Sequence, residues 1–245
     1  MFVLYSKNKD EENMIVVESK NSSFESIQKK YPNAIIADIT SDAKGALVRL
    51  SPSFPHGGIP VSDYDYATAY SVEAIWQGLK VFENEDVDTS IFTMNTAIRL
   101  KRNSPGLGKM IGHRVCSNGE EILNYADARR RIFISRYRWV LDYKVQDIIR
   151  SLRKASETKT IVLLNFYANC EIQNYKEPIS CAYLVKAYAE GLPPYEDAFE
   201  TTKIYHFRTN GRREWTDVSE KRLIKPVPVY KKSNQLKLPL DYKVF

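Results

Sequence analysis

The sequence contains few cysteines, and their arrangement argues against two classes of site. Three cysteines occur among 245 residues, at Cys116, Cys170 and Cys181. They are odd in number, widely spaced and include no CxxC pair, so the sequence predicts neither a disulfide framework nor a zinc centre. We interpret all three as small core residues, and we expect no metal and no cofactor.

Long apolar runs and several common motifs are also missing. No run of about 18 apolar residues is present. Residues 1–13 begin with a few apolar residues and continue with charged ones, unlike a signal peptide or a membrane span. No GxGxxG follows the first predicted strand, and no GxSxG accompanies His56-Gly57-Gly58. These absences argue against a Rossmann site and an esterase. We expect a cytoplasmic protein with no membrane partner.

The positive charge is concentrated at the end of the chain. The formal net charge is +6, and residues 221–245 contain seven lysines and arginines against one aspartate. We predict an extended basic arm there. Such an arm is typically solubilising or packed along an acidic face, and it can also contact nucleic acid.

The order of apolar and turn-forming segments predicts an α+β, predominantly helical single domain. We divide it into an N-terminal βαβ flank (1–48), a core (49–192) and a hairpin with the basic arm (193–245). The flank consists of a strand, a helix and a strand at residues 14–18, 23–31 and 34–38, and a buried strand is expected at 160–166. Helices are expected at residues 71–82, 88–100, 118–125, 126–141, 145–152 and 178–191, with a turn leading into a short helix at 104–113.

The most informative stretch is SVEAIWQGLKVF, residues 71–82. Read as a helix, it gathers its apolar side chains in an arc of roughly 80°, with Glu73, Gln77 and Lys80 together beside it. A carboxylate, an amide and an amine can transfer a proton, orient a substrate atom and act as a cation or nucleophile. Trp76, between the two arcs, can close a pocket over a flat ligand. The same pattern also fits a solvated helix face.

Two further stretches supply candidate binding residues. The segment SPSFPHGGIP predicts a loop, and its glycine pair lets backbone amides approach a ligand closely. Ser51, His56 and Gly57 are therefore candidates for a site wall, although a tight structural turn explains the glycines as well. Between residues 126 and 141, five arginines alternate with aromatic residues. This pattern can bind phosphate and stack on bases, or form a core face with a solvated arginine face.

The motifs around the stretch at 71–82 resemble the NADAR family. Glu73-xxx-Gln77-xx-Lys80, followed by Phe82, looks like the signature helix of that family. LSPSF at residues 50–54 resembles its Phe-Ser-x-Phe-type loop, with a leucine in place of the first aromatic residue.

Further segments extend the resemblance to residues 50–192. Ser104-Pro105, with Gly112 eight residues after Ser104, is similar to the family's Ser/Thr-Pro…Leu-Gly-Arg segment, but His113 stands where the arginine is usual. Tyr125 takes the place of a tryptophan before the long helix, and residues 163–166 fit the strand that precedes the late site loop.

One departure from the family pattern concerns the end of the site. The family usually has an acidic residue followed by Trp-Gly there, whereas this chain reads NFYANCEIQNY at residues 165–175. Asn165, Asn169 and Glu171 are each candidates to substitute for the acidic residue.

The resemblance implies hydrolysis of an N-glycosidic bond between ribose C1 and a base or amine, in a nucleotide or ADP-ribosylated substrate. Glu73 would stabilise positive charge at the anomeric carbon or activate water, and Lys80 would protonate the leaving group or form an imine with the opened sugar. Gln77 would orient a hydroxyl group or a base edge.

The same resemblance assigns the remaining binding roles. Trp76 and Tyr167 would stack on the base, and Arg136, foremost among the arginines, would bind phosphate. Asn165 and Asn169 complete the candidate binding residues. The alternative is a non-catalytic protein on the same fold that binds ADP-ribose-like nucleotides, or nucleic acid through the basic tail. Neither alternative implies an oligomeric state.

Overall fold

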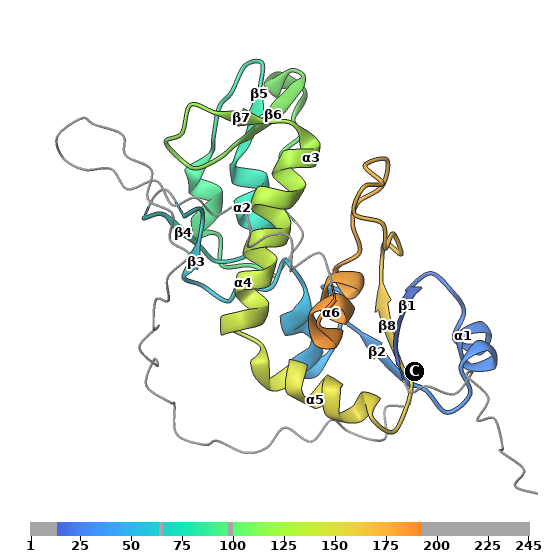
Figure 1. Cartoon of the computed structure of the whole chain (residues 1–245). Helices are drawn as coiled ribbons and strands as arrows, with labels where there is room; N and C mark the ends of the chain where they lie inside the picture. Colours follow the sequence, from blue (N-terminus) through green and yellow to red (C-terminus); the bar gives the residue numbers. More distant parts are fainter. Residues whose placement is uncertain (1–13, 64–65, 98–99, 193–245) are drawn as a thin grey trace, which may run out of the picture.

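The strand, helix and strand predicted near the N-terminus form as expected, but they share their sheet with a distant strand. The computed structural model describes residues 14–63, 66–97 and 100–192. Within these residues the chain has a mixed α/β fold with six α-helices and three small sheets (Figure 1). No helix among them is long and apolar enough to cross a membrane. The predicted hairpin and basic arm at 193–245 lie outside the described residues.

The first sheet is parallel and has the order β1-β8-β2. Its strands are β1 (Ile15–Ser19), β2 (Ile35–Asp38) and β8 (Ile161–Asn165), and Leu163 of β8 lies opposite Val17 on one side and Ala37 on the other. The near-continuous apolar sequence of β8 is typical of a strand covered on both faces. The boundary predicted at residue 48 therefore separates β1 and β2 from β8, although the three strands form one sheet.

One helix connects two strands of this sheet, and two later helices pack against it. Helix α1 (Phe24–Lys30) connects β1 and β2 and begins at Ser23, whose hydroxyl oxygen accepts a hydrogen bond from the amide of Ser26. Helices α5 (Gln146–Ser156) and α6 (Cys181–Glu190) contact β8 and each other. Gly191 ends α6 with a left-handed φ of 69°, as the sequence predicted.

The stretch at residues 71–82 forms a helix followed by a strand, so the prediction of one helix through residue 82 is wrong. Helix α2 (Val72–Gly78) begins at Ser71, whose Oγ accepts a hydrogen bond from the amide of Ala74. Residues Lys80–Phe82 form β5. Lys80 therefore does not share a helix with Glu73. The cause is non-local, because β5 gains its backbone hydrogen bonds from a strand about thirty residues later.

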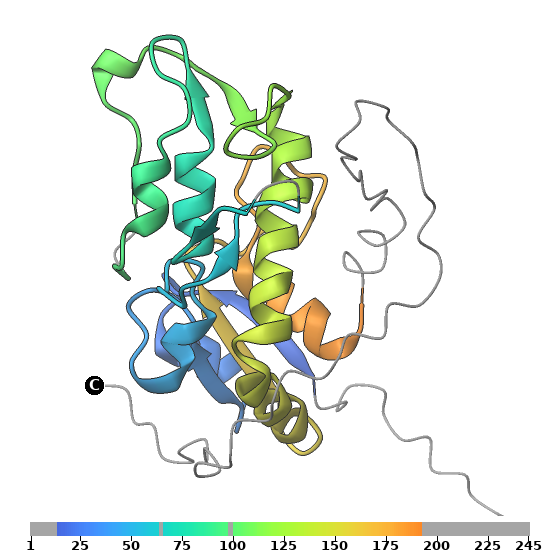
Figure 2. The same cartoon turned by 90° about the vertical axis from the view of Figure 1, so that its left-hand side faces the viewer.

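That partner strand replaces a second predicted helix. Strand β6 (Met110–Arg114) follows a single 3₁₀ turn at Pro105–Leu107, and it pairs with β5 on one side and β7 (Ile122–Leu123) on the other. The predicted short helix within 104–113 and the helix at 118–125 are therefore wrong. Figures 1 and 2 both show this antiparallel sheet at the end of the molecule opposite α5.

The long helix predicted at residues 126–141 forms, with an irregular middle. It runs from α3 (Tyr125–Ala128) through a π-helical segment, Arg129–Ile134, into α4 (Ser135–Tyr143). Asn124 caps its start by accepting a hydrogen bond from the amide of Asp127. The start of this helix contacts β6 and β7, and its residues contribute to the walls of the cavity described below.

The remaining elements are short. The predicted loop at 51–60 ends in β3 (Ile59–Pro60), which pairs with β4 (Thr68–Ala69). In place of the helix predicted at 88–100, a 3₁₀ helix spans Thr89–Thr93, and another spans Gly45–Leu50. Of the three cysteines, Cys116 and Cys181 are buried as predicted, but Cys170 is exposed.

Candidate functional site

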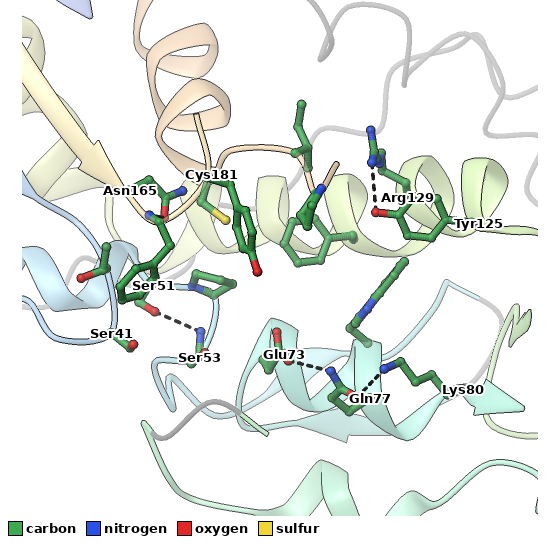
Figure 3. A pocket seen from close by; sticks show the side chains of 18 residues that line it. Ser41, Ser51, Ser53, Glu73, Gln77, Lys80, Tyr125, Arg129, Asn165 and Cys181 are labelled. Carbon is green, nitrogen blue, oxygen red and sulfur yellow. Dashed lines mark hydrogen bonds between the residues drawn. The ribbon is translucent and has the colours of Figure 1, made fainter. Parts of the chain in front are cut away.

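A cavity of about 310 Å³ lies where several chain segments meet (Figure 3). Its walls come from the segments that follow β2 and β8, from the serine loop at 51–53, from α2 and β5, from the long helix at 125–143 and from the start of α6. The segments after β2 and β8 are at the carboxyl edge of a parallel sheet, which is where ligands generally bind in such sheets. The cavity is therefore the natural candidate site.

Glu73, Gln77 and Lys80 all line this cavity and are joined by hydrogen bonds. Gln77 Nε2 donates to Glu73 Oε1 at 2.7 Å, and Lys80 Nζ donates to Gln77 Oε1 at 2.7 Å. Glu73 is 8% exposed and Gln77 is 6% exposed. The amide of Gln77 thus holds a carboxylate with its N–H and an ammonium group with its oxygen.

The local sequence explains how these three groups meet. Glu73 and Gln77 are four residues apart, so they lie on one face of α2. The amide of Glu73 also donates to the carbonyl of Pro52, which ties α2 to the serine loop. Lys80 reaches Gln77 from β5, and the amide of Arg102 donates to the same Gln77 oxygen at 3.3 Å. The guanidinium of Arg102 in turn donates to the carbonyl of Lys80.

Aromatic residues form one side of the cavity. Trp76 is partly exposed there, and its ring meets Tyr125 and Phe133 edge-on at centroid distances of 6.0 and 5.7 Å. His113 lies against the indole at 3.9 Å and is fully buried. Burial, followed by the nearby charge of Lys80, lowers the pKa of His113 to about 3. His113 is therefore uncharged at neutral pH, where its ring supports Trp76.

The arginine predicted to bind phosphate does not line the cavity. Arg136 donates from both terminal nitrogens to the carboxylate of Asp63, at 3.0 and 2.8 Å. That bidentate pair occupies the fork of the guanidinium, so the prediction for Arg136 is corrected. The arginine that does line the cavity is Arg129.

Arg129 is directed at the protein itself. It is 1% exposed, and its guanidinium donates to the carbonyls of Ile172, Asn174 and Glu177 and to the hydroxyl of Tyr125. These bonds fasten the segment after β8 to the long helix. Arg129 thereby positions a wall of the cavity.

The end of the cavity away from Lys80 is formed by Ser51, Asn165 and Cys181, with Tyr167 also in the lining. Burial, followed by the charge of Glu73, raises the pKa of the Cys181 thiol to about 12, although a hydrogen bond from Asn165 opposes the rise. Cys181 is therefore protonated at neutral pH, which does not suit a nucleophile.

Three other predicted residues lie outside the lining. His56 Nε2 is 2.9 Å from the carbonyl oxygen of Arg49, and burial lowers the pKa of His56 to about 4. Gly57 has a φ of 70° and packs near the ring of Tyr70. Asn169 donates to the carbonyls of two residues in its own loop. These three residues have structural contacts in place of the predicted binding roles.

Sequence reasoning missed several residues that line the cavity. Thr40, Ser41 and Ser53 were not candidates, and neither was Phe133. Ser53 is next but one to the predicted Ser51, and Phe133 belongs to the arginine-aromatic stretch. Thr40 and Ser41 follow β2, and only its pairing with β8 brings them to the site. No group of three or more potential metal ligands was found among the described residues.

Comparison with known proteins yields a family but no activity. A family model described as a family of unknown function (DUF6939) matches residues 19–185. Neither the curated proteins nor the solved structures gave a match.

Proposed function

The chain belongs to this family of unknown function, and from the geometry of the cavity we propose that it hydrolyses the N-glycosidic bond between ribose C1 and a base or amine. The observation that carries the proposal is the hydrogen-bonded series Glu73, Gln77 and Lys80 beside an aromatic wall. A NADAR-like architecture, with a flank, a core and a basic arm, and a cytoplasmic location are parts of the same proposal.

In the proposed reaction, Glu73 acts on the sugar and the attacking water, and Lys80 acts on the departing nitrogen. As the bond from C1 to nitrogen breaks, positive charge develops on the sugar, and the Glu73 carboxylate stabilises that charge. Glu73 then accepts a proton from the water whose oxygen bonds to C1. The Lys80 ammonium donates a proton to the departing nitrogen. Gln77 fixes both groups, which reduces the reorganisation needed during the reaction.

The aromatic wall suits the other half of such a substrate. Trp76 is held by the buried ring of His113 and faces the cavity. Its indole, with Tyr167 and Phe133, offers flat surfaces on which a base can stack. The cavity volume of about 310 Å³ is at the small end of the range for ligand sites. A single ribosylated base or amine is therefore the size of group that we propose it holds.

The test is mass spectrometry of a panel of ribosylated substrates incubated with the protein. The panel contains nucleosides, ribosylamino-pyrimidines with and without phosphate, NAD-derived nucleotides and guanine-ADP-ribosylated DNA. We expect release of a free base or amine, and a fall in turnover of about a hundredfold to ten-thousandfold in Glu73→Gln and in Lys80→Ala. Glu121→Gln and Lys154→Ala, which alter residues outside the cavity, serve as controls. Turnover that survives in both site variants would contradict the proposal.

A chemical trap distinguishes the two roles open to Lys80. If its amine attacked the opened sugar, the resulting imine would be reduced by borohydride to a stable secondary amine on Lys80. The proposed role as proton donor predicts no such adduct during turnover. Peptide mapping that finds the adduct would replace the proton-donor mechanism with covalent catalysis at the same residue.

One observation favours a second candidate, a protein that binds such ligands without cleaving them. Among the described residues that line the cavity, Glu73 is the sole carboxylate, whereas most glycoside hydrolases use a pair of carboxyl groups. This candidate predicts a bound ligand and no product across the whole panel. If nucleic acid is also bound through the basic tail, affinity should fall with salt and with truncation after Gly191.

A further inference from the structure

Hydroxyl groups line the end of the cavity that lies away from Lys80. Figure 3 shows Ser41, Ser51, Ser53 and Asn165 on one side of Glu73, with Lys80 on the other. Ser41 follows β2, and Asn165 is the last residue of β8. The parallel sheet thus brings polar side chains from its carboxyl edge to this end of the cavity, which we call the hydroxyl end.

Two buried hydroxyl groups at this end have protons to donate. Ser51 and Ser53 are 4% and 5% exposed, and both line the cavity. Ser51 Oγ accepts a hydrogen bond from the amide of Ser53 at 3.3 Å. Within the described ranges of the chain, neither hydroxyl donates its proton to an acceptor. Because both hydroxyl groups face the cavity, each can donate its proton to a ligand oxygen there.

The charges behind the hydroxyl end disfavour an anion there. The side chain of Thr40, part of the lining, donates to the carboxylate of Asp38 at 2.7 Å, and Ser41 Oγ is 3.5 Å from that of Asp42. Lys20 Nζ lies 3.0 Å from both carboxylates. One ammonium group thus faces two carboxylates, and Glu73 adds a third negative charge. Lys80 and Arg129, the two cations of the lining, lie on the other side of Glu73 (Figure 3), so the hydroxyl end is the more negative end of the cavity. A phosphate group here would be repelled, whereas a neutral polar group would not.

We propose that the hydroxyl end binds the sugar of the substrate in unphosphorylated form, so that the substrate is a nucleoside-like N-riboside. The ribose hydroxyls accept hydrogen bonds from Ser51 and Ser53, C1 faces Glu73 and the base lies toward Trp76. The reaction in this assignment rests on the proposed function, but the sugar subsite itself requires no turnover. Its specificity departs from the phosphorylated substrates that the sequence resemblance implied.

The test uses probes without a base, namely D-ribose and D-ribose 5-phosphate, with the full-length protein and calorimetric titration. We expect ribose to bind at least about tenfold more tightly than its phosphate ester, a difference of about 1.4 kcal/mol. Ser53→Ala should weaken ribose binding about threefold to tenfold, because one hydrogen bond is lost. Ser62→Ala is the matched control, since Ser62 is similarly buried at 7% exposure and does not line the cavity.

A second variant tests the electrostatic part. Asp42→Asn should increase the affinity for ribose 5-phosphate and leave that for ribose unchanged, whereas Asp63→Asn should alter neither. No binding of ribose, or equal or tighter binding of the phosphate ester, would overturn the assignment. If the protein hydrolyses N-ribosides but binds no ribose, the proposed function stands and the ribose subsite is refuted. Ribose binding without any turnover would keep the subsite and remove the reaction.

Discussion

At the scale of single residues, His113 lies next to both the charged part of the site, at Lys80, and its aromatic part, at Trp76. It is fully buried against Trp76, opposite Lys80 in the pairing of β5 with β6. Its pKa of about 3 lies far below the ordinary value of about 6.5. In the unfolded chain His113 takes up a proton as the pH falls below about 6.5, whereas in the folded chain it stays neutral until about pH 3. The stability that its neutral form contributes is therefore present above about pH 6.5 and is lost progressively below it.

This difference predicts a pH-dependent loss of stability. Between pH 7 and pH 5, His113 should lower the free energy of unfolding by about 2 kcal/mol. Urea denaturation at the two pH values measures the change. His113→Phe should reduce the pH dependence by a similar amount, whatever its own stability at pH 7. Equal pH dependence in the two proteins would show that the imidazole is protonated without penalty in the fold.

The side-chain contacts that the sequence predicted correctly are between residues close together in the chain. Glu73 and Gln77 meet because they are one helical turn apart, and their contact was predictable. Arg136 shows the limit of the same reasoning, because its partner Asp63 is 73 residues away. The charge of an arginine can be predicted from sequence, but whether it faces a ligand depends on which carboxylate the fold places beside it. The catalytic roles themselves stay predictions.

At the scale of elements, Gly78 lets the end of α2 lie close against a neighbouring segment. A Cβ atom at residue 78 would lie 2.3 Å from the ring of Phe92 and 3.0 Å from the carbonyl oxygen of Asp88. Phe92 is 3% exposed, so it has little room to move. Gly78 therefore allows the close packing of α2 on the 3₁₀ helix at Thr89–Thr93.

Gly78→Ala should consequently destabilise the protein, although alanine is the better helix former. We expect a loss of about 1–3 kcal/mol from overpacking. Gly106→Ala is the control, since a Cβ there meets nothing within 4 Å. Thermal unfolding of both variants measures the difference. A Gly78→Ala protein as stable as the parent would mean that the ring of Phe92 moves aside at no cost.

The elements that sequence analysis missed are those that need a distant partner. Ile161–Asn165 was predicted as a strand because its own composition is strongly apolar. Lys80–Phe82 continues the helical pattern of α2, and it becomes a strand through pairing with Met110–Arg114. Both segments were predicted as helical. Each is too short to show by itself the alternation of side chains that identifies a strand.

At the scale of the whole molecule, the central strand of the parallel sheet comes from late in the chain. β8 has β1 on one side and β2 on the other. Both neighbours belong to the first 48 residues, which sequence analysis treated as a flank. Without them, β8 would have no backbone partner on either side, and the N–H and C=O groups along both of its edges would be unpaired.

A chain that begins at residue 49 should therefore fail to fold. We expect it to lose the cooperative thermal transition and most of the near-ultraviolet circular dichroism of the full chain, because the core is shared between the two segments. Addition of a peptide with residues 1–48 should restore part of both signals. A cooperatively unfolding chain from 49 to 245 alone would show that the flank is an independent addition.

The π-helical segment Arg129–Ile134 has a consequence for how the site can diversify. It contains Phe133 and Arg129, both in the cavity wall, in a helix whose local hydrogen bonds span five residues. Loss of one residue here would restore regular α-helical winding. Because the wider π-helical turn takes up the extra residue, α4 would keep its faces, and only the side chains of the segment itself would change direction. The cavity wall formed by Arg129 and Phe133 should therefore change shape with the length of this segment as well as with its residues. A gap in an alignment at this position marks a site of altered shape, even where all the polar residues of α2 are kept.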